Sequence, residues 1–291
     1  MLNIAESPAK ATVNQGGLRL AQGDLDGAEK LYREAIAIDP DNATAHANLG
    51  YLLALRGRHE EAIGEAERAI ALDPARSAPW AHMGMSQVAL GSVDDGLSSL
   101  SRAVRLDPKN HFAWDAMGRT LLALGRPGEA EIAWASAVAA RPDDVDLLIS
   151  LATALAAQDK TSGAVRVLYR ATAVAPNSVR AWTQLGVVAL VRQDHGTAGE
   201  ALLQALDLDP TCAEARFHLA VLHVLVGAVE EARAELLALI YEGSEFKDEA
   251  RALLARFARR DQGDQRDQDD KSASRPDQRE PSSDGRDLAE K

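Results

Sequence analysis

The stretch GDLDGAEKLYREAIAIDP, residues 23–40, decides the fold because the chain repeats it with small changes. It returns as GRHEEAIGEAERAIALDP at residues 57–74 and as GSVDDGLSSLSRAVRLDP at residues 91–108. The proline that closes the stretch recurs at intervals of 34 residues, at Pro40, Pro74, Pro108, Pro142, Pro176 and Pro210. Self-similarity at a fixed period of this length is typical of proteins built from stacked copies of one small structural unit.

The repeat divides most of the chain into seven units. Each unit is counted so that the closing proline is its thirty-second residue, which places Ser244 there in the seventh unit. A short N-terminal lead, residues 1–8, precedes the first unit. The predicted units are residues 9–42, 43–76, 77–110, 111–144, 145–178, 179–212 and 213–244.

The composition indicates a helical protein without a nucleic-acid partner. Of the 291 residues 46% are apolar and only 4% are aromatic, and Ala and Leu dominate the apolar set. Both are strong helix formers. The net charge of -12 repels phosphate backbones.

The termini and the hydropathy of the chain bear on its location. The first residues lack a basic stretch followed by an apolar one, and no segment runs to about 18 uncharged apolar residues. We therefore expect no direct insertion into a membrane and a cytoplasmic location. The single cysteine, Cys212, cannot form an internal disulfide.

Two positions of the unit are always small. A glycine inside a helix costs about 1 kcal/mol relative to alanine, so its repetition requires a packing reason, such as the close approach of two helices. Position eight is Gly16, Gly50, Gly84, Gly118, Ala152, Gly186 and Ala220. Position twenty is Ala28, Ala62, Gly96, Ala130, Ala164, Ala198 and Ala232.

This pattern resembles the tetratricopeptide repeat, a helix-turn-helix unit of about 34 residues. The resemblance implies that positions eight and twenty are where the two helices of one unit touch. Glycines at position fifteen predict left-handed residues that end the first helix. Four tryptophans are predicted to belong to the core rather than to a ligand site: Trp80, Trp114 and Trp182 at position four, and Trp134 at position twenty-four.

The repetition itself predicts the architecture. One helix pair cannot bury its apolar face alone, and stacking makes the exposed face of each unit the core of the next. The chain is therefore interpreted as an all-α, right-handed superhelical solenoid of about seven repeats, with a capping helix at residues 245–260. Residues 261–291 hold ten acids and six bases with almost no apolar side chain, and predict a disordered charged tail. That tail is either a solubilising extension or a tether or docking motif.

The sequence contains no recognisable catalytic or metal-binding motif. It lacks a phosphate-binding glycine loop, the HExxH and CxxC metal motifs and the GxSxG nucleophile motif. His218 and His223 are five residues apart and so point to different sides of a helix, which argues against a paired metal site. We expect no enzyme, no catalytic residue, no metal and no cofactor.

A binding surface is predicted on the first helix of each unit. Position six lies two residues from position eight, about 200° around the helix, and so faces away from the second helix. In the tetratricopeptide family this side lines an inner groove that commonly binds extended peptides or partner helices. Polar side chains at position six can hydrogen-bond a peptide backbone, or they simply face solvent. They are Asn14, Asn48, His82, Ser150, Gln184 and His218.

Neighbouring positions refine the predicted ligand. Positions five and nine are mostly apolar, so the groove is expected to take an apolar or mixed segment. The candidate anchors are Tyr51, Met85, Arg119 and Phe217. Family members that clamp the acidic tails of heat-shock chaperones use Lys at position five and Asn at position nine. Val13 and Gly17 stand there in the first unit, so we expect no such adaptor.

The sequence thus predicts a non-enzymatic protein-protein interaction scaffold or adaptor that binds a partner segment during assembly of a complex. Two alternatives stay open at this point. The chain could associate with itself to build a structural platform, which a concentration-dependent size would reveal. It could also be the regulatory subunit of a separately encoded enzyme, which co-purification of that enzyme would reveal.

Overall fold

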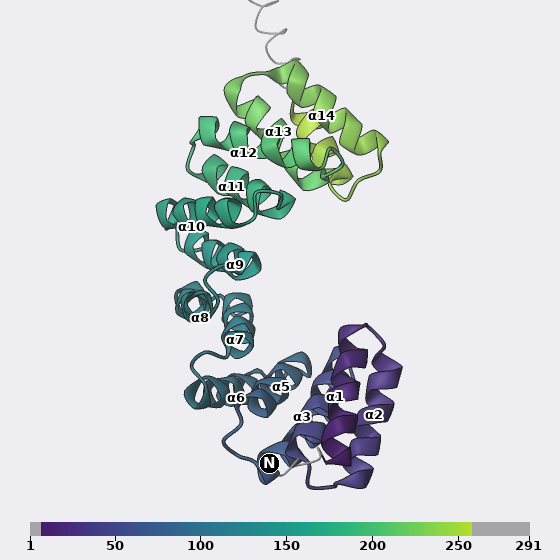
Figure 1. The fold of residues 1–291 in the computed structure, drawn as a ribbon. Coiled ribbons are helices and arrows are strands. Elements are labelled where there is room, and N and C mark those ends of the chain that lie inside the picture. The colour runs from purple at the N-terminus through teal and green to yellow at the C-terminus, as the bar shows by residue number, and fades with distance from the viewer. Residues whose placement is uncertain (1–6, 258–291) are drawn as a thin grey trace, which may run out of the picture. The chain divides into compact units, whose positions relative to one another are not determined.

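The structure is a computed structural model of the chain, and it describes residues 7–257. Within this range the chain is helical without any strand, which confirms the predicted all-α helical repeat fold (Figure 1). A further helical stretch covers residues 247–257. The other helices are α1 (Pro8–Ala21), α2 (Leu25–Ile38), α3 (Ala43–Leu55), α4 (His59–Leu72), α5 (Ser77–Ala89), α6 (Val93–Leu106), α7 (His111–Ala123), α8 (Pro127–Ala140), α9 (Val145–Ala156), α10 (Thr161–Val174), α11 (Val179–Val191), α12 (His195–Leu208), α13 (Ala213–Val226) and α14 (Val229–Tyr241).

The chain forms two compact units, which divide after Pro210. From here on, the first and second unit are these two, and the 34-residue copies are called repeats. The first unit holds α1 to α12, and the second holds α13, α14 and the helical stretch 247–257. In the first unit each odd-numbered helix packs against the even-numbered helix that follows it, and each even-numbered helix packs against the next odd one. Odd-numbered helices of adjacent pairs also touch, α3 against α5 and α5 against α7.

Glycines at position eight lie where the two helices of a pair cross, as the sequence predicts. A Cβ built on Gly84 would lie 2.7 Å from the carbonyl oxygen of Gly96 and 3.0 Å from the backbone nitrogen of Leu100. A Cβ on Gly118 would lie 2.5 Å from the indole atom Cε2 of Trp134. Real Cβ atoms almost never approach another heavy atom this closely, so only glycine fits at these two crossings.

The turns inside the helix pairs contain a left-handed residue even where glycine is missing. Glycines occupy this place in five pairs, and all five have positive φ: Gly23, Gly57, Gly91, Gly125 and Gly227. In the pairs α9–α10 and α11–α12 the place is taken by Asp159 with φ 59° and Gln193 with φ 60°. A left-handed residue other than glycine costs roughly 1–2 kcal/mol. The packing of the two helices therefore sets this backbone conformation whether or not the residue favours it.

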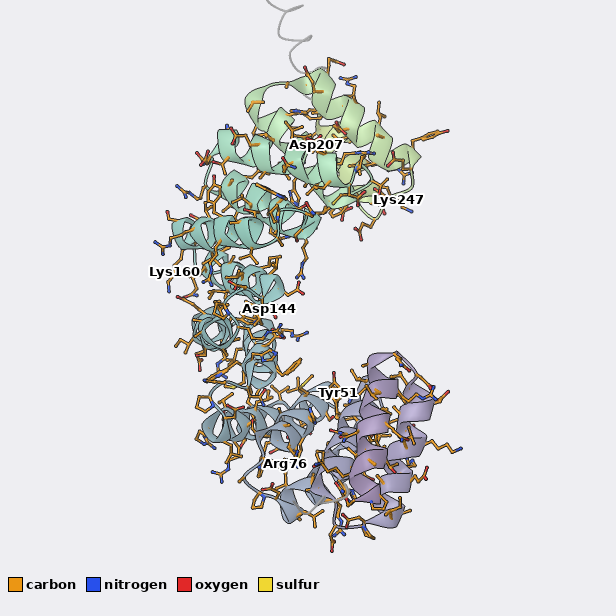
Figure 2. The ribbon with its side chains drawn as sticks, in the orientation of Figure 1. Tyr51, Arg76, Asp144, Lys160, Asp207 and Lys247 are labelled. Atoms are coloured by element: carbon orange, nitrogen blue, oxygen red, sulfur yellow. The ribbon has the colours of Figure 1, made fainter. Side chains whose placement is uncertain are left out.

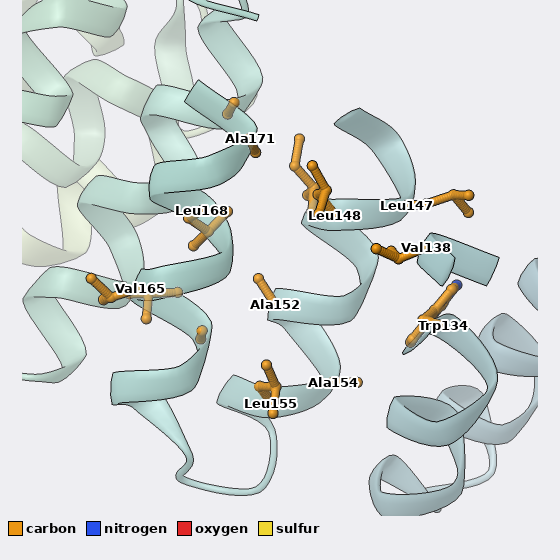
Figure 3. Close-up of a cluster of buried hydrophobic side chains, with 14 of the residues drawn as sticks. Trp134, Val138, Leu147, Leu148, Ala152, Ala154, Leu155, Val165, Leu168 and Ala171 are labelled. Atoms are coloured by element: carbon orange, nitrogen blue, oxygen red, sulfur yellow. The ribbon is translucent and has the colours of Figure 1, made fainter. Parts of the chain in front are cut away.

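The core runs from one helix pair into the next. Trp134 of α8, Leu148 of α9 and Leu168 of α10 belong to one buried cluster, parts of which Figure 3 shows between these helices. Trp134 is 2% exposed, in agreement with its predicted core role. Trp80, Trp114 and Trp182 are half-buried, and each packs against a buried cluster. Each pair thus covers apolar surface of its neighbour, which is how a repeat array is stabilised.

The second unit has a small core of its own. Ala250 and Phe257 of the helical stretch 247–257 are buried together with Leu236 and Leu239 of α14. The role of this stretch as a cap stays a prediction. Residues 258–260 of the predicted capping helix, the predicted tail 261–291 and residues 1–6 of the predicted lead lie outside the described residues.

Candidate binding groove

Three pockets lie along the odd-numbered helices of the first unit. The first, called here the apolar pocket, has a volume of about 430 Å³ and is lined by Tyr51 and Leu55 of α3, His82 and Met85 of α5, and Phe112 and Arg119 of α7. The second, the side pocket, measures about 220 Å³ and shares Tyr51, Leu55, His82 and Met85 with the first. The third, the arginine pocket, measures about 380 Å³ and extends from α7 to α11.

The apolar pocket exposes large apolar side chains that a globular core would bury. Phe112 is 59% exposed, Leu55 is 53% exposed and Met85 is 36% exposed. Tyr51 extends from α3 beside α5 (Figure 2), and its ring lies 4.8 Å from the ring of His82, measured between centroids. Contiguous exposed apolar side chains with a polar rim are typical of binding surfaces.

The structure brings together five of the predicted site residues. Tyr51, His82 and Met85 line the apolar pocket, Arg119 lines both that pocket and the arginine pocket, and Ser150 lines the arginine pocket. The other five lie outside these three pockets: Asn14 exposed on α1, Asn48 half-buried on α3, Gln184 half-buried on α11, and Phe217 and His218 half-buried on α13 of the second unit.

One expectation about the groove holds only in part. The sequence predicts that the apolar residues at position five line it, and Ala81 does line the apolar pocket, although it is 1% exposed. Four other residues at this position are buried and line none of the three pockets: Val13, Ala47, Ile149 and Thr183. The reason is the contact between odd-numbered helices of adjacent pairs, which closes over this position. In the second unit Phe217 at the same position is half-buried and stacks on Phe246, with ring centroids 5.1 Å apart.

His82 is held in a mostly apolar environment between α3 and α5. Its ring hydrogen-bonds the backbone of Ala47, while its Nδ1 atom is buried and has no hydrogen-bond partner among the described residues. Burial lowers the pKa of His82 to about 4, and the bond to Ala47 opposes this shift only in part. The imidazole is therefore neutral at physiological pH.

This pKa predicts an acid sensitivity that belongs to His82. In the unfolded chain the imidazole binds a proton below about pH 6.5, whereas in the fold it does so only near pH 4. Between these values the unfolded state binds more protons, so stability falls as the pH falls. We expect this group to remove about 3 kcal/mol of unfolding free energy between pH 7 and pH 4.

Urea unfolding of the wild type and of His82→Gln at a series of pH values measures this effect. Glutamine already occupies position six in α11, as Gln184, and its side chain does not titrate. The difference between the two proteins should be flat above about pH 7 and should change by about 3 kcal/mol towards pH 4. Parallel profiles over the whole range would contradict the assignment.

The arginine pocket combines charges of both signs. Arg119 donates a hydrogen bond to Asp115, and Asp115 also accepts a bond of 2.8 Å from the indole Nε1 of Trp134. Arg141 lies 3.5 Å from Asp144, and Arg180 lies 2.7 Å from Asp146. Each of the three arginines thus has an aspartate partner, so the pocket suits a ligand segment with mixed charges.

His111 lines this pocket, and its surroundings shift its pKa. The pKa of His111 is lowered, first because the ring is partly buried and second because the cation of Arg141 lies nearby. His111 also contacts a guanidinium nitrogen of Arg141 at 3.2 Å. The lowered pKa of His111 favours the neutral imidazole beside the Arg141 cation.

Sequence reasoning missed several residues of the groove. Phe112 and Asp146 both stand at position two of their repeats. Arg180 holds the same position one repeat after Asp146, so the sequence already showed the opposite charges that pair between α9 and α11. Arg141 and Asp144 lie in the turn between α8 and α9, where a search of helix faces does not reach them.

Comparison with known proteins agrees with this architecture. The family model of the tetratricopeptide C-terminal domain of cilia and flagella-associated protein 70 matches residues 1–218, and a second tetratricopeptide repeat model matches residues 189–257. The chain belongs to the tetratricopeptide repeat family. Tetratricopeptide proteins of this fold are typically non-catalytic and act as scaffolds for interactions between proteins. No relative among curated proteins matches the chain.

Solved tetratricopeptide structures share the fold. PilF of Pseudomonas aeruginosa is 20% identical over 72% of this chain and 95% of its own, with a TM-score of 0.61. YrrB, described as having an unusual peptide-binding site, is 21% identical over 63% of this chain and 95% of its own, with a TM-score of 0.53. The Cut9-Hcn1 hetero-tetramer structure matches at 18% identity over 72% of this chain and 42% of that chain, with a TM-score of 0.60.

These identities are low, so the likeness concerns the fold alone. In the described part of this tetratricopeptide protein, no helix has the length and apolar character that crossing a bilayer requires.

Proposed function

We propose that the protein is an adaptor that holds an extended segment of a partner protein in a groove made of the apolar pocket and the arginine pocket. The observation that carries this proposal is that the two pockets share Phe112 and Arg119 and therefore continue into one another along α3, α5, α7 and α9. A peptide of several residues spans such a surface, whereas a small metabolite fills one pocket only.

The two halves of the groove select different parts of the segment. Tyr51, Met85 and Phe112 supply apolar surface on which a large side chain is desolvated, and such anchors carry most of the affinity in peptide complexes. Arg119, with Ser150 beside it in the arginine pocket, recognises polar or charged residues that follow. Asn48 and Gln184, outside the pockets, extend the polar contacts to the peptide backbone.

The likeness to YrrB supports this proposal, since that tetratricopeptide protein has a peptide-binding site. The likeness to the Cut9-Hcn1 hetero-tetramer supports a role in holding other chains in a complex. Assembly of a multi-protein complex is the process that a groove of this kind would serve.

A steric block tests the groove. Ala78 lines the apolar pocket and is exposed near the start of α5, so tryptophan at this position fills the pocket without disturbing the core. Ala135 is also exposed, on α8, the second helix of its pair, and it lies outside the three pockets. Ala135→Trp is therefore the matched control.

The experiment starts from peptides selected from a random display library on the full wild-type chain. Titration calorimetry of a selected peptide is expected to show at least about a tenfold loss of affinity for Ala78→Trp, equivalent to about 1.4 kcal/mol, and no change for Ala135→Trp. Equal binding to all three proteins, or a library from which no peptide is enriched, would count against the groove.

A further inference from the structure

The side pocket between α3 and α5 gathers buried polar atoms that lack partners. Among the described residues, His59 Nδ1, His82 Nδ1 and Ser86 Oγ are buried without a hydrogen bond, and all three residues line this one pocket. Ser86 is 0% exposed. A buried polar group that makes no hydrogen bond destabilises the fold, so native proteins rarely retain one without a role.

Ser86 differs from the residue at the same position of the next repeat. Thr120 of α7 is also buried, but its hydroxyl donates a hydrogen bond of 2.8 Å to the carbonyl oxygen of Ala116, one turn earlier. The corresponding acceptor for the Ser86 hydroxyl would be the backbone carbonyl oxygen of His82, but these two groups form no hydrogen bond. Position ten is apolar elsewhere, for example Leu52 and Val188. A hydroxyl at this position is therefore not required by helix packing.

The chemistry of these atoms indicates what would pair with them. The hydrogen bond between the His82 ring and the backbone of Ala47 favours the protonated ring, so the ring is its donor. In the neutral ring the unpaired nitrogen, Nδ1, is then an acceptor. Ser86 is one turn from His82 on the same side of α5, and its hydroxyl can donate or accept. The walls around them are apolar, with Tyr51, Leu55 and Met85 from the two helices.

We propose that the side pocket receives a tyrosine side chain of the bound partner segment, with its phenol hydroxyl donating to His82 Nδ1 and accepting from Ser86 Oγ. This assignment rests on the proposed function, because the side pocket shares four lining residues with the apolar pocket of the groove. A phenylalanine fills the same walls but leaves both polar atoms unpaired, and a charged side chain loses its hydration among apolar walls.

Two small probes separate tyrosine from phenylalanine without knowledge of the partner. N-acetyl-tyrosinamide and N-acetyl-phenylalaninamide differ only in the hydroxyl, and nuclear magnetic resonance titration of the full chain with each gives the two dissociation constants. We expect the tyrosine probe to bind in the millimolar range and at least about tenfold more tightly than the phenylalanine probe, because a site built to bond a hydroxyl rejects the analogue that lacks it.

Ser86→Ala should weaken the tyrosine probe by about tenfold and leave the phenylalanine probe unchanged. It should also raise the urea midpoint by roughly 0.5 M, because it removes an unpaired buried hydroxyl. Thr120→Ala is the matched control, since it removes a buried hydroxyl that has a partner. It should leave both probe affinities unchanged and should not raise the midpoint.

Equal affinities of the wild type for the two probes, or an unchanged affinity of Ser86→Ala for the tyrosine probe, would overturn the assignment. The outcome is independent of the peptide selection described above. If no peptide is selected but the two probes bind with different affinities, the result supports the tyrosine pocket and contradicts the extended groove. If selected peptides bind in the groove but the probes do not differ, the groove stands and the tyrosine pocket does not.

Discussion

Gly84→Ala is expected to lower the free energy of unfolding by about 3 kcal/mol, although it adds a single methyl group. The new Cβ would lie 2.7 Å from the carbonyl oxygen of Gly96, which is backbone and cannot rotate away. It would also lie 3.0 Å from the backbone nitrogen of Leu100, a fully buried residue of α6. The pair α5–α6 can relieve this overlap only if the two helices separate, and separation opens the core that Leu100 fills.

Gly64→Ala is the control for this substitution and should have the opposite sign. Gly64 is exposed inside α4, and a Cβ there would have nothing within 4 Å. Alanine should therefore stabilise the protein by roughly 0.5–1 kcal/mol through helix propensity alone. Urea unfolding followed by circular dichroism measures both variants. If Gly84→Ala is as stable as the wild type, the two helices are not in the close contact described above.

The pair Gly118 and Trp134 should show strong energetic coupling. Gly118→Ala places a Cβ 2.5 Å from the indole, and this overlap is expected to cost about 2–3 kcal/mol. Trp134→Leu creates a cavity beside Gly118 and loses the hydrogen bond to Asp115, and is expected to cost about 3 kcal/mol. In the double variant the added methyl group occupies part of the cavity, so its cost should be smaller than the sum by at least about 1 kcal/mol.

The neighbouring helix pair shows why this combination can pack. Ala152 and Leu168 hold the same two positions in α9 and α10, and both are buried, at 1% and 0% exposure. The double variant copies that pair into α7 and α8. A double-mutant cycle of unfolding free energies measures the coupling. If the two effects simply add, the small residue at position eight is not matched to the size of the residue opposite it.

The fold was predictable because each of its local requirements is written in the sequence many times. A closing proline every 34 residues marks the period, and the glycines of position fifteen mark the turns. Asp159 and Gln193 show the limit of this reasoning, because they adopt the same left-handed conformation without being glycine. Their backbone is set by the two helices that each turn connects, and no property of the residue itself reveals it.

The groove was predictable only in part. The helix face could be derived from the helical period, and three of its residues, Tyr51, Met85 and Arg119, line the apolar pocket. The same reasoning assigned all of position five to the groove, although Val13, Ala47 and Ile149 are buried and line none of the three pockets. The period of one helix tells which side chains share a face, but only the neighbouring helix determines which of them it covers.

By itself, then, the sequence determined the all-helical repeat, its turns and the crossing points of its helices, because these depend on residues close together in the chain and recur in every repeat. The tertiary structure alone decided which side chains the stacked helices leave open. It brought Phe112 of α7 and Tyr51 of α3 into the lining of one pocket, and it left the Ser86 hydroxyl buried without a hydrogen-bond partner among the described residues. Pockets form between repeats that are similar but not identical, so their shape depends on the packing of particular side chains from separate helices, which no single repeat encodes.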